Sequence, residues 1–272
     1  MKIIKNINEL KLSIKGLKNL SFVPTMGSLH RGHISLIKIA KKKTNKVLVS
    51  IFVNPKQFNS KKDFKLYPRN LSKDLKILKK LNVNFVFIPS YDQIYKFKPK
   101  NKIFLHRFSN KLCGKYRPGH FKGVINVVNR FLSLIRPKFI ILGKKDRQQL
   151  FLIQKHIDKR KINSKVISCN TIRNKNGLPY SSRNKNLTFK EILLASRVIK
   201  LIRNEKKKVK KEKKITLNFN NVKAKIMKIG VKKIDYVEVL NIKNLSKLKN
   251  PKQKFNIFIA FYLGKTRLID NL

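Results

Sequence analysis

The sequence is poor in residues that several protein classes require. Its 272 residues include two cysteines, Cys113 and Cys169, and no tryptophan. Two cysteines outside a Cys-x-x-Cys pair cannot build a disulfide framework, so a reducing compartment is expected. No run of about 18 apolar residues occurs, and lysines interrupt the N-terminal stretch that a signal peptide would need. These absences predict a cytoplasmic protein with no membrane partner.

Acidic residues are also scarce. There are 67 lysines and arginines against 12 aspartates and glutamates, which gives a formal net charge of +55 and a pI near 10.7. Of the basic residues 54 are lysines, spread along the chain, whereas a nucleic-acid face would be concentrated and richer in arginine. The lysines accompany many Asn, Ile and Phe residues, which favours a bias in genome composition. We expect no specific nucleic-acid site, only weak attraction to polyanions at low salt.

The chain nevertheless contains enough apolar residues for a folded core. Hydrophobic residues make up 42% of the sequence, with 18 phenylalanines. This is too rich for a disordered polycation. The length is consistent with one large or two modest domains.

Short apolar runs alternate with amphipathic stretches over the first two thirds of the chain. The apolar runs, expected as strands, are 20–23, 47–53, 83–88, 139–142 and 165–168. The stretches expected as helices are 28–43, 70–80, 123–135 and 146–159. The run VLVSIFV (47–53) is typical of a strand buried on both faces of a parallel sheet. This order predicts an α/β fold with a doubly wound parallel sheet, in which ligands bind beyond the carboxyl ends of the strands.

The pattern changes after residue 173. A turn-like stretch is followed by a helical segment, a highly charged segment and two alternating segments expected as strands: 174–179, 189–204, 205–214, 234–239 and part of 255–263. Alternation of apolar and polar residues indicates a small α+β unit. We therefore predict two domains, 1–173 and 174–272.

A histidine-containing loop follows the first of these strands. The sequence PTMGSLHRGH (24–33) places His30 and His33 three residues apart at the start of a helix, beside free backbone N–H groups. Gly27 and Gly32 allow close approach of a ligand, and imidazole N–H groups can hold phosphoryl oxygens, so the loop suits a triphosphate. Two alternatives are incidental surface histidines and a zinc site, although HExxH spacing is absent and no Cys or carboxylate is close in sequence.

Polar residues also follow the next strand. Asn54 and Gln57 can orient the hydroxyls and carboxylate of a small polar substrate, although Asn-Pro is also an ordinary turn. Further along the chain, Lys145 lies in a glycine turn that opens a helix, where its ammonium can neutralise phosphate charge.

A last polar segment lies beyond the predicted domain boundary. Ser181, Ser182 and Arg183 suit a β- or γ-phosphate. The serines can equally cap the amino end of a helix.

These segments occur in an order that resembles the pantothenate synthetase (pantoate–β-alanine ligase) family of the HxGH nucleotidylyltransferase-like superfamily. The similarity extends over nearly the whole chain, through PTMGSLHRGH, VNPKQF, YPR, RPGHFKGV, GKKDRQQL, SSRN, IDYVEV and GKTRLID. The resemblance implies a Rossmann-like N-terminal domain that binds ATP and pantoate, a smaller C-terminal lid domain and a homodimer. It also implies ATP-dependent joining of pantoate and β-alanine through a pantoyl adenylate, with release of AMP and pyrophosphate.

The resemblance also implies roles for individual residues. His30, His33 and Lys145 are the expected catalytic residues, with His33 as the proton donor, and Lys145, Ser181, Ser182 and Arg183 would stabilise the phosphates. Gln57 and Gln149 match pantoate contacts, and Gln57 also matches a β-alanine contact. Mg²⁺ would bridge phosphate oxygens, with Asp74 as the only protein contact we name. The expected ATP-binding residues are Met26, Gly27, Ser28, Leu29, His30, Arg31, Gly32, His33, Gly143, Lys144, Lys145, Asp146, Ile172, Tyr180, Ser181, Ser182 and Arg183.

Five positions depart from the pattern of the family. The residues found at these positions are Arg31, Lys144, Arg147, Cys113 and Asn59. The first three replace residues that need not touch substrate, whereas Cys113 replaces a Glu and Asn59 replaces a Gly close to the expected site. Slow turnover is one expected consequence.

Other functions remain open on the sequence alone. A different HxGH nucleotidylyltransferase would share the histidine motif but not the QF, RPGH and SSRN segments. A class I aminoacyl-tRNA synthetase fits the charge, but the chain leaves little room for an anticodon-binding region. A basic nucleic-acid-binding protein on this scaffold would bind polyanions at physiological salt without ATP turnover.

Overall fold

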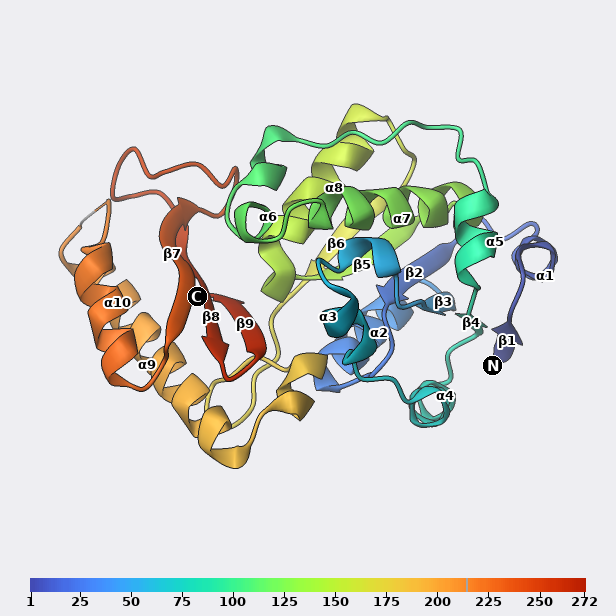
Figure 1. Cartoon of the computed structure of the whole chain (residues 1–272). Helices are drawn as coiled ribbons and strands as arrows, with labels where there is room; N and C mark the ends of the chain where they lie inside the picture. Colours follow the sequence, from blue (N-terminus) through green and yellow to red (C-terminus); the bar gives the residue numbers. More distant parts are fainter. Residues whose placement is uncertain (214) are drawn as a thin grey trace. The chain divides into compact units, whose positions relative to one another are not determined.

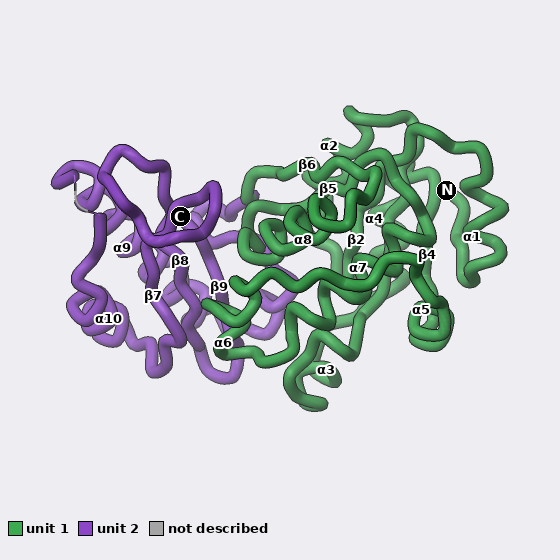
Figure 2. The backbone as a smooth tube through the Cα atoms, turned by 90° about the horizontal axis from the view of Figure 1, so that it is seen from above, with its two compact units in different colours: residues 1–171 green, residues 172–272 purple. Residues whose placement is uncertain are grey.

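The computed structural model describes residues 1–213 and 215–272 and divides into two compact units, residues 1–171 and 172–272 (Figure 2). The boundary expected from the sequence lies two residues further along the chain. Residue 214, which ends the predicted charged segment, lies outside the described residues.

The first unit is built on a six-stranded sheet in which every neighbouring pair is parallel. The strands lie in the order β1-β4-β3-β2-β5-β6. Their bounds are β1 (Lys2–Ile4), β2 (Leu20–Thr25), β3 (Lys46–Ile51), β4 (Phe85–Phe87), β5 (Phe139–Gly143) and β6 (Lys165–Cys169). The chain reverses its direction across the sheet between β2 and β5, as in doubly wound folds. The predicted fold class is confirmed.

Helices cover both faces of this sheet (Figure 1). Their bounds are α1 (Ile7–Ser13), α2 (Arg31–Lys43), α3 (Lys61–Lys65), α4 (Leu71–Lys80), α5 (Tyr91–Lys96), α6 (Cys113–Tyr116), α7 (His120–Ile135) and α8 (Arg147–Lys159), with short 3₁₀ helices η1 (Pro55–Gln57), η2 (Arg107–Asn110) and η3 (Lys144–Asp146). On one face, Ile37 of α2 and Leu78 of α4 pack with Val23 and Val49. On the other, the Phe131 ring of α7 contacts Phe22, Phe52 and Phe87. Burial on both faces explains why these strands are almost continuously apolar.

A buried histidine ties an irregular segment of the first unit to helices α7 and α8. His156 is fully buried, and its Nδ1 accepts a hydrogen bond from the Phe104 N–H at 3.0 Å. Its Nε2 lies 3.0 Å from the Asn129 amide oxygen, and Asn129 donates to the Asn101 carbonyl at 2.7 Å. Burial, assisted by Arg160, lowers the pKa of His156 to about 4. The imidazole is therefore neutral in the folded protein at pH 7.

Acidification is expected to destabilise the protein through His156. The unfolded chain has the ordinary histidine pKa near 6.5 and binds more protons between that pH and 4, so stability falls as pH decreases through this window by up to about 3 kcal/mol. Urea unfolding at pH 7 and pH 4.5 measures the loss. His156→Gln, which removes the titrating ring, is expected to lose less over this interval although it is less stable at pH 7. Equal losses in the two proteins would contradict the assignment.

The second unit combines two helices with a three-stranded antiparallel sheet of order β7-β8-β9. The bounds of its elements are η4 (Ser182–Asn186), α9 (Phe189–Lys211), α10 (Phe219–Lys228), β7 (Lys233–Asn241), β8 (Phe255–Leu263) and β9 (Thr266–Asn271). Ile199 and Ile202 of α9 and Ile226 of α10 are buried in one core with Ile257 and Ile259 of β8. The predicted α+β character of this unit is thus present.

Helix α9 extends seven residues beyond the predicted helix, into the charged segment. Two of its residues there are buried, Val209 at 2% exposure and Glu205 at 8%. The Glu205 carboxylate accepts a hydrogen bond from Lys225 Nζ at 3.0 Å. Packing of one face therefore keeps a lysine-rich segment helical, which local charge does not reveal.

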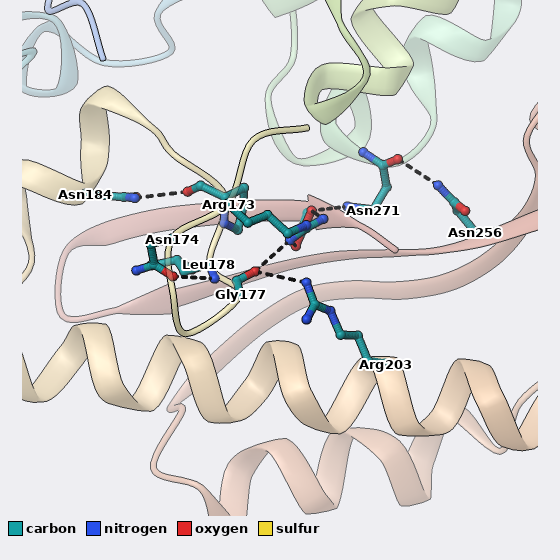
Figure 3. A network of polar contacts seen from close by, with 10 residues as sticks. Arg173, Asn174, Gly177, Leu178, Asn184, Arg203, Asn256 and Asn271 are labelled. Carbon is teal, nitrogen blue, oxygen red and sulfur yellow. Dashed lines mark hydrogen bonds and ion pairs between the residues drawn. The ribbon is translucent and has the colours of Figure 1, made fainter. Parts of the chain in front are cut away.

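A buried ion pair holds the first segment of the second unit in place. Arg173 donates two hydrogen bonds to the Asp270 carboxylate, at 2.6 and 2.9 Å, and a third to the Gly177 carbonyl at 3.0 Å. Arg203 also donates to this carbonyl, and Asn174 accepts from the Leu178 N–H (Figure 3). The turn predicted at 174–179 is therefore anchored to strand β9 and helix α9.

Candidate active site

The geometry of the first unit places two loops side by side at the carboxyl edge of its sheet. Strand β2 continues into loop 26–30 and then α2, and its neighbour β5 continues into η3 and then α8. Strands β3 and β4, which follow β2, and strand β6, which follows β5, lie on opposite sides of this pair, so the two loops lie at the switch point of the sheet, where ligands bind in doubly wound folds. The histidines and Lys145 predicted from the sequence lie on these two loops.

The conformation of loop 26–30 is set by a buried carboxylate from a distant helix. Asp74 of α4 is 2% exposed, and its two oxygens accept hydrogen bonds from the Ser28 and Leu29 N–H groups, each at 2.7 Å. Ser28 has a positive φ of 52°, unusual for a residue other than glycine. At Gly27, with φ 74°, a Cβ atom would lie 3.0 Å from an Asp74 oxygen. Asp74 thus positions the loop, and the engagement of both oxygens argues against its predicted contact with Mg²⁺.

His30 is the N-cap of α2 and lies just before its first turn. The predicted helix start at residue 28 is therefore wrong by three residues, because Asp74 takes up the N–H groups of the preceding residues. The His30 Nδ1 accepts a hydrogen bond from the Gly32 N–H at 3.1 Å. When the ring is neutral, its proton is therefore on Nε2.

His33 lies directly beside His30. The centroids of the two rings are 4.0 Å apart, with 30° between the ring planes. The His33 Nδ1 is buried and has no hydrogen-bond partner among the described residues. Burial, then the nearby His30 and Lys145, lowers the pKa of His33 well below its ordinary value. The site therefore holds a neutral imidazole that a negative ligand would make more basic.

Lys145 supplies the positive charge of this cluster from the neighbouring loop. Its side chain is 19% exposed, and its ammonium lies 3.5 Å from an Asp146 carboxylate oxygen. Asp146 is the N-cap residue of α8 but makes no side-chain capping hydrogen bond. The structure thus brings the three predicted catalytic residues close together at the switch point of the sheet.

The departures Arg31 and Arg147 are the first residues of α2 and α8, and Lys144 is the first residue of η3. Arg31 is exposed, and Lys144 donates to the Asn170 side chain at 2.8 Å. Burial lowers the pKa of Arg147 from its ordinary value. Nothing in the structure explains the presence of arginine at position 147.

Gln57 is held in place by residues from three segments. Its Nε2 donates to the Met26 sulfur in the histidine loop, and its Oε1 accepts from the Asn54 amide at 3.4 Å. Its backbone carbonyl accepts from Arg117 at 3.1 Å and from His120 Nδ1 at 2.7 Å. The RPGH segment therefore anchors η1, which carries Gln57.

Asn59 reinforces this connection. Its amide donates to the Pro118 carbonyl at 2.6 Å, and its oxygen accepts from Arg117 Nε at 3.2 Å. The asparagine that departs from the family pattern therefore joins the segment after η1 to the RPGH segment.

Helix α7 also contacts η1 through a glycine. A Cβ atom at Gly123 would lie 2.1 Å from the Lys56 carbonyl oxygen and 2.9 Å from the Gln57 nitrogen. Gly123 is therefore required for the close approach of α7 to η1. The helix begins at His120, three residues before its predicted start, and its N-cap is Gly119 with φ 78°.

Gly123→Ala is expected to destabilise the first unit by about 1–3 kcal/mol, because the added methyl group must displace the η1 backbone. Urea unfolding measures this loss. The control is Gly143→Ala, where the nearest atom to a Cβ is Leu36 Cδ2 at 4.0 Å and little change is expected. Equal stability of the two variants would show that η1 can shift to accommodate the methyl group without loss of unfolding free energy.

The two adjacent glutamines of α8 have different environments. Gln148 is buried, accepts from the Cys113 N–H and donates to the Phe108 and Lys111 carbonyls, at 3.1, 3.0 and 2.7 Å. Gln149 is half-buried, and the described residues give its amide no hydrogen-bond partner. Gln148 is therefore structural, whereas Gln149 has an amide available to a ligand. The Cys113 thiol is buried, and its backbone helps to hold this segment.

The remaining predicted ATP-binding residues belong to the second unit. The Ile172 carbonyl accepts from the Tyr180 N–H at 3.1 Å, which closes the turn before η4. The Ser181 hydroxyl accepts a hydrogen bond from the Arg183 N–H at 3.3 Å. Ser181 therefore caps the amino end of η4, which is the alternative role that the sequence left open for these serines. Ser182 is buried at 6% exposure.

Comparison with known proteins identifies the family of this chain. The family model described as "Pantoate-beta-alanine ligase" matches residues 2–272. The chain belongs to the pantoate-beta-alanine ligase family. A pantothenate synthetase from Francisella tularensis subsp. novicida (strain U112) is 40% identical, over 98% of this chain and 94% of that protein. As a member of this family the chain is an ATP-dependent ligase.

Solved structures of the pantoate-beta-alanine ligase family show the same fold. The Francisella tularensis enzyme, crystallised with "Beta-gamma ATP and Beta-alanine", superposes with a TM-score of 0.83 at 40% identity and covers 100% of this chain and 97% of its own. The Thermus thermophilus enzyme superposes with a TM-score of 0.89 at 28% identity, covering 100% of this chain and 99% of its own.

The structural roles of two residues, Asp74 and Tyr95, escaped the sequence analysis. Asp74 was linked to a metal rather than to the loop it holds, and Tyr95, which contacts Asn54, was not singled out. Neither has a local signal, since each acts on a segment more than 40 residues away. Over the described part of the chain, no helix has the length and apolar character needed to span a bilayer.

Proposed function

We propose that this chain joins (R)-pantoate to β-alanine at the expense of ATP. In the first step the pantoate carboxylate attacks the α-phosphorus of ATP, the bond to the bridging oxygen breaks, and pyrophosphate leaves with its electron pair. In the second step the β-alanine amine attacks the acyl carbon of pantoyl adenylate, AMP leaves, and the amine loses a proton. The observation that supports this reaction most directly is the pairing of His30 and His33 beside Lys145 at the switch point of the sheet.

The three residues act on charge that moves from the α-phosphate to pyrophosphate. The Nε2–H of His30 and the Lys145 ammonium are donors for phosphoryl oxygens. His33 is neutral in the free protein, and the phosphates of ATP raise its basicity because they place negative charge beside it. It can therefore take up a proton on binding and donate it to the departing pyrophosphate. Preorganised donors of this kind stabilise a transition state without reorganisation.

The chemistry needs no protein nucleophile. The substrate carboxylate is already ionised at pH 7, and AMP is a good leaving group in the second step. The protein's contribution is then to align the two substrates and to neutralise charge. Gln57 and Gln149 are proposed to orient pantoate by hydrogen bonds, and Gln57 also to contact β-alanine.

Mg²⁺ is proposed to enter with the phosphates of ATP. Within the residues that the structure describes, no three His, Cys, Asp or Glu side chains are grouped to hold a metal ion, and both Asp74 oxygens are engaged by the backbone. Mg²⁺ commonly binds through substrate phosphates and water with few protein ligands. The ion would neutralise phosphate charge.

The other parts of the proposal concern residues and assembly. Met26 to His33 and Gly143 to Asp146 are proposed to bind ATP, together with Ile172, Tyr180, Ser181, Ser182 and Arg183 of the second unit. We further propose that the chain acts in the cytoplasm as a homodimer, with residues 1–173 binding ATP and pantoate and residues 174–272 serving as a lid.

The test is product formation from purified protein. ATP, Mg²⁺, (R)-pantoate and β-alanine are incubated with the enzyme, and AMP, pyrophosphate and pantothenate are quantified by chromatography. Pantothenate is expected only when both pantoate and β-alanine are present. Without β-alanine, pyrophosphate release is expected to stop near one equivalent per site if the acyl adenylate stays bound.

Two results would contradict the proposal. Adenylyl transfer to another acceptor, with none to pantoate, would indicate a different nucleotidylyltransferase. Failure to bind ATP, combined with polyanion binding that persists at physiological salt, would indicate a nucleic-acid-binding protein instead.

A further inference from the structure

A tyrosine outside the histidine loop is connected to Gln57 through hydrogen bonds. The Tyr95 hydroxyl, on helix α5, lies 2.8 Å from the Asn54 side-chain oxygen, 41 residues away in sequence. Asn54 follows strand β3 and is 1% exposed. Its amide nitrogen donates to the Gln57 Oε1 at 3.4 Å and to the Gly123 carbonyl at 3.2 Å. The path from Tyr95 to Gln57 therefore passes through one buried side chain.

The hydrogen bonds of Asn54 are compatible with only one of the two flip orientations of its side-chain amide. Its oxygen accepts from the Tyr95 hydroxyl and from the Lys56 N–H at 3.2 Å, and its nitrogen makes the two donations to Gln57 and Gly123. A flipped amide would face a carbonyl with its oxygen and a backbone N–H with its nitrogen, which is unfavourable for buried groups. With Asn54 donating to Oε1, Gln57 directs its NH₂ group elsewhere, and this group reaches Met26 in the histidine loop.

The ring of Tyr95 is held from several sides. The Lys56 ammonium lies 4.2 Å from its centroid, the Arg130 guanidinium carbon lies 5.0 Å away, and the Tyr91 ring lies 4.6 Å away. Arg130 is itself fixed by hydrogen bonds to the carbonyls of Ile94 and Phe97. Burial raises the pKa of Tyr95 to about 12, so its hydroxyl stays protonated and remains a donor to Asn54.

We propose that Tyr95 is a positioning residue for pantoate binding, acting through Asn54 to fix the amide of Gln57 with its NH₂ group toward the histidine loop. This inference rests on the proposed function. Tyr95 is not among the residues proposed to contact ATP and acts on Gln57 through Asn54, so its removal should weaken pantoate binding and preserve ATP binding.

Steady-state kinetics of Tyr95→Phe provide the first test. The variant keeps the ring and both cation contacts but loses the hydroxyl. The KM for pantoate is expected to rise about 10-fold, because one well-placed hydrogen bond is lost. The KM for ATP should stay unchanged. The control is Tyr91→Phe on the same helix, because Tyr91 is 41% exposed and its hydroxyl has no hydrogen bond among the described residues. This control should behave as the parent protein does.

A double-mutant cycle separates positioning from general stability. If Tyr95 acts through Gln57, Tyr95→Phe in a Gln57→Ala background adds no further loss of pantoate affinity. Additive effects, or a parallel rise of both KM values together with a lower Tm, would overturn the proposal. So would an unchanged KM in Tyr95→Phe.

A measurement on the free protein keeps this test independent of turnover. The side-chain NH₂ signals of Asn54 and Gln57 in ¹⁵N-correlated NMR spectra, assigned with Asn54→Asp and Gln57→Ala, are expected to shift in Tyr95→Phe and not in Tyr91→Phe. Unmoved signals would overturn the positioning role. If the signals shift but the parent protein makes no pantothenate, the proposed function fails while the connection from Tyr95 to Gln57 stands.

Discussion

His33→Ala is expected to lower kcat for pantothenate formation by about 100- to 1,000-fold, the range found when one preorganised donor to a developing negative charge is removed. The effect should fall on pyrophosphate release, because His33 lies beside His30 and Lys145, where the phosphates of ATP are proposed to bind. The KM for β-alanine should change little. Rapid-quench measurement of pyrophosphate release isolates this step.

The physical reason is the environment of the ring. In the free protein burial and two neighbouring basic groups keep His33 neutral, so only a bound anion can make it a proton donor. Binding of ATP should therefore take up protons near pH 7, and affinity should increase as pH falls. Calorimetry in buffers of different ionisation enthalpy measures the uptake, which should decrease in His33→Ala.

A histidine elsewhere in the first unit provides the control. His106 caps η2 by accepting from the Phe108 N–H, and His106→Asn retains an acceptor of the same kind. This variant is expected to keep the parent kcat. A His33→Ala enzyme that releases pyrophosphate at the parent rate would exclude His33 from the chemistry.

Asp74→Ala is expected to have the second large effect, on both stability and turnover. The change leaves the Ser28 and Leu29 N–H groups buried without their acceptors, which costs about 2–5 kcal/mol of unfolding free energy. It also releases a loop whose Ser28 is held at a positive φ. Because His30 and His33 follow this loop directly, kcat should fall by about 100-fold when the geometry loosens.

Denaturant unfolding and steady-state kinetics on the same preparations separate the two effects. Asp74→Asn tests the geometry further, because its NH₂ group would face a backbone N–H in place of an accepting oxygen. The control is Asp92→Asn on α5, whose side chain is 69% exposed and 3.8 Å from Lys96. If Asp74→Asn folds stably and turns over at the parent rate, Asp74 does not set the loop.

Chemical shifts of loop 26–30 distinguish this role from metal binding. An effect through the loop predicts altered His30 and His33 signals in the Asp74 variants without Mg²⁺. A lost Mg²⁺ contact predicts parent-like signals and a defect relieved by raising the Mg²⁺ concentration.

The local features of the sequence were sufficient for several correct predictions. Runs such as 47–53 indicated strands buried on both faces, and the alternation of strands and helices indicated a doubly wound sheet. The strand–glycine–helix setting of the histidines placed them at the edge where ligands bind. These predictions succeeded because backbone geometry and one-sided burial leave periodic signals within about 5–15 residues.

Element ends were predicted less well where distant residues determine them. Helix α2 begins at residue 31 because Asp74 binds the preceding N–H groups, and α9 continues to residue 211 because Val209 and Glu205 are buried. Strand β9 and helix α10 carry few local signals and were not predicted as elements, although the segment of β9 belonged to the recognised family pattern.

By itself, the sequence determined the class of the fold, its family and the residue types available to hold phosphate, since these depend on local pattern and on motifs read in order. Only the tertiary structure decided which groups support them. Asp74 holds the histidine loop, Asn59 joins two segments, Gln148 is structural where Gln149 is available, and Tyr95 reaches Gln57 through Asn54. Hydrogen bonds between segments distant in sequence have no period in the chain, because the folded sheet and not the local chain brings their partners together.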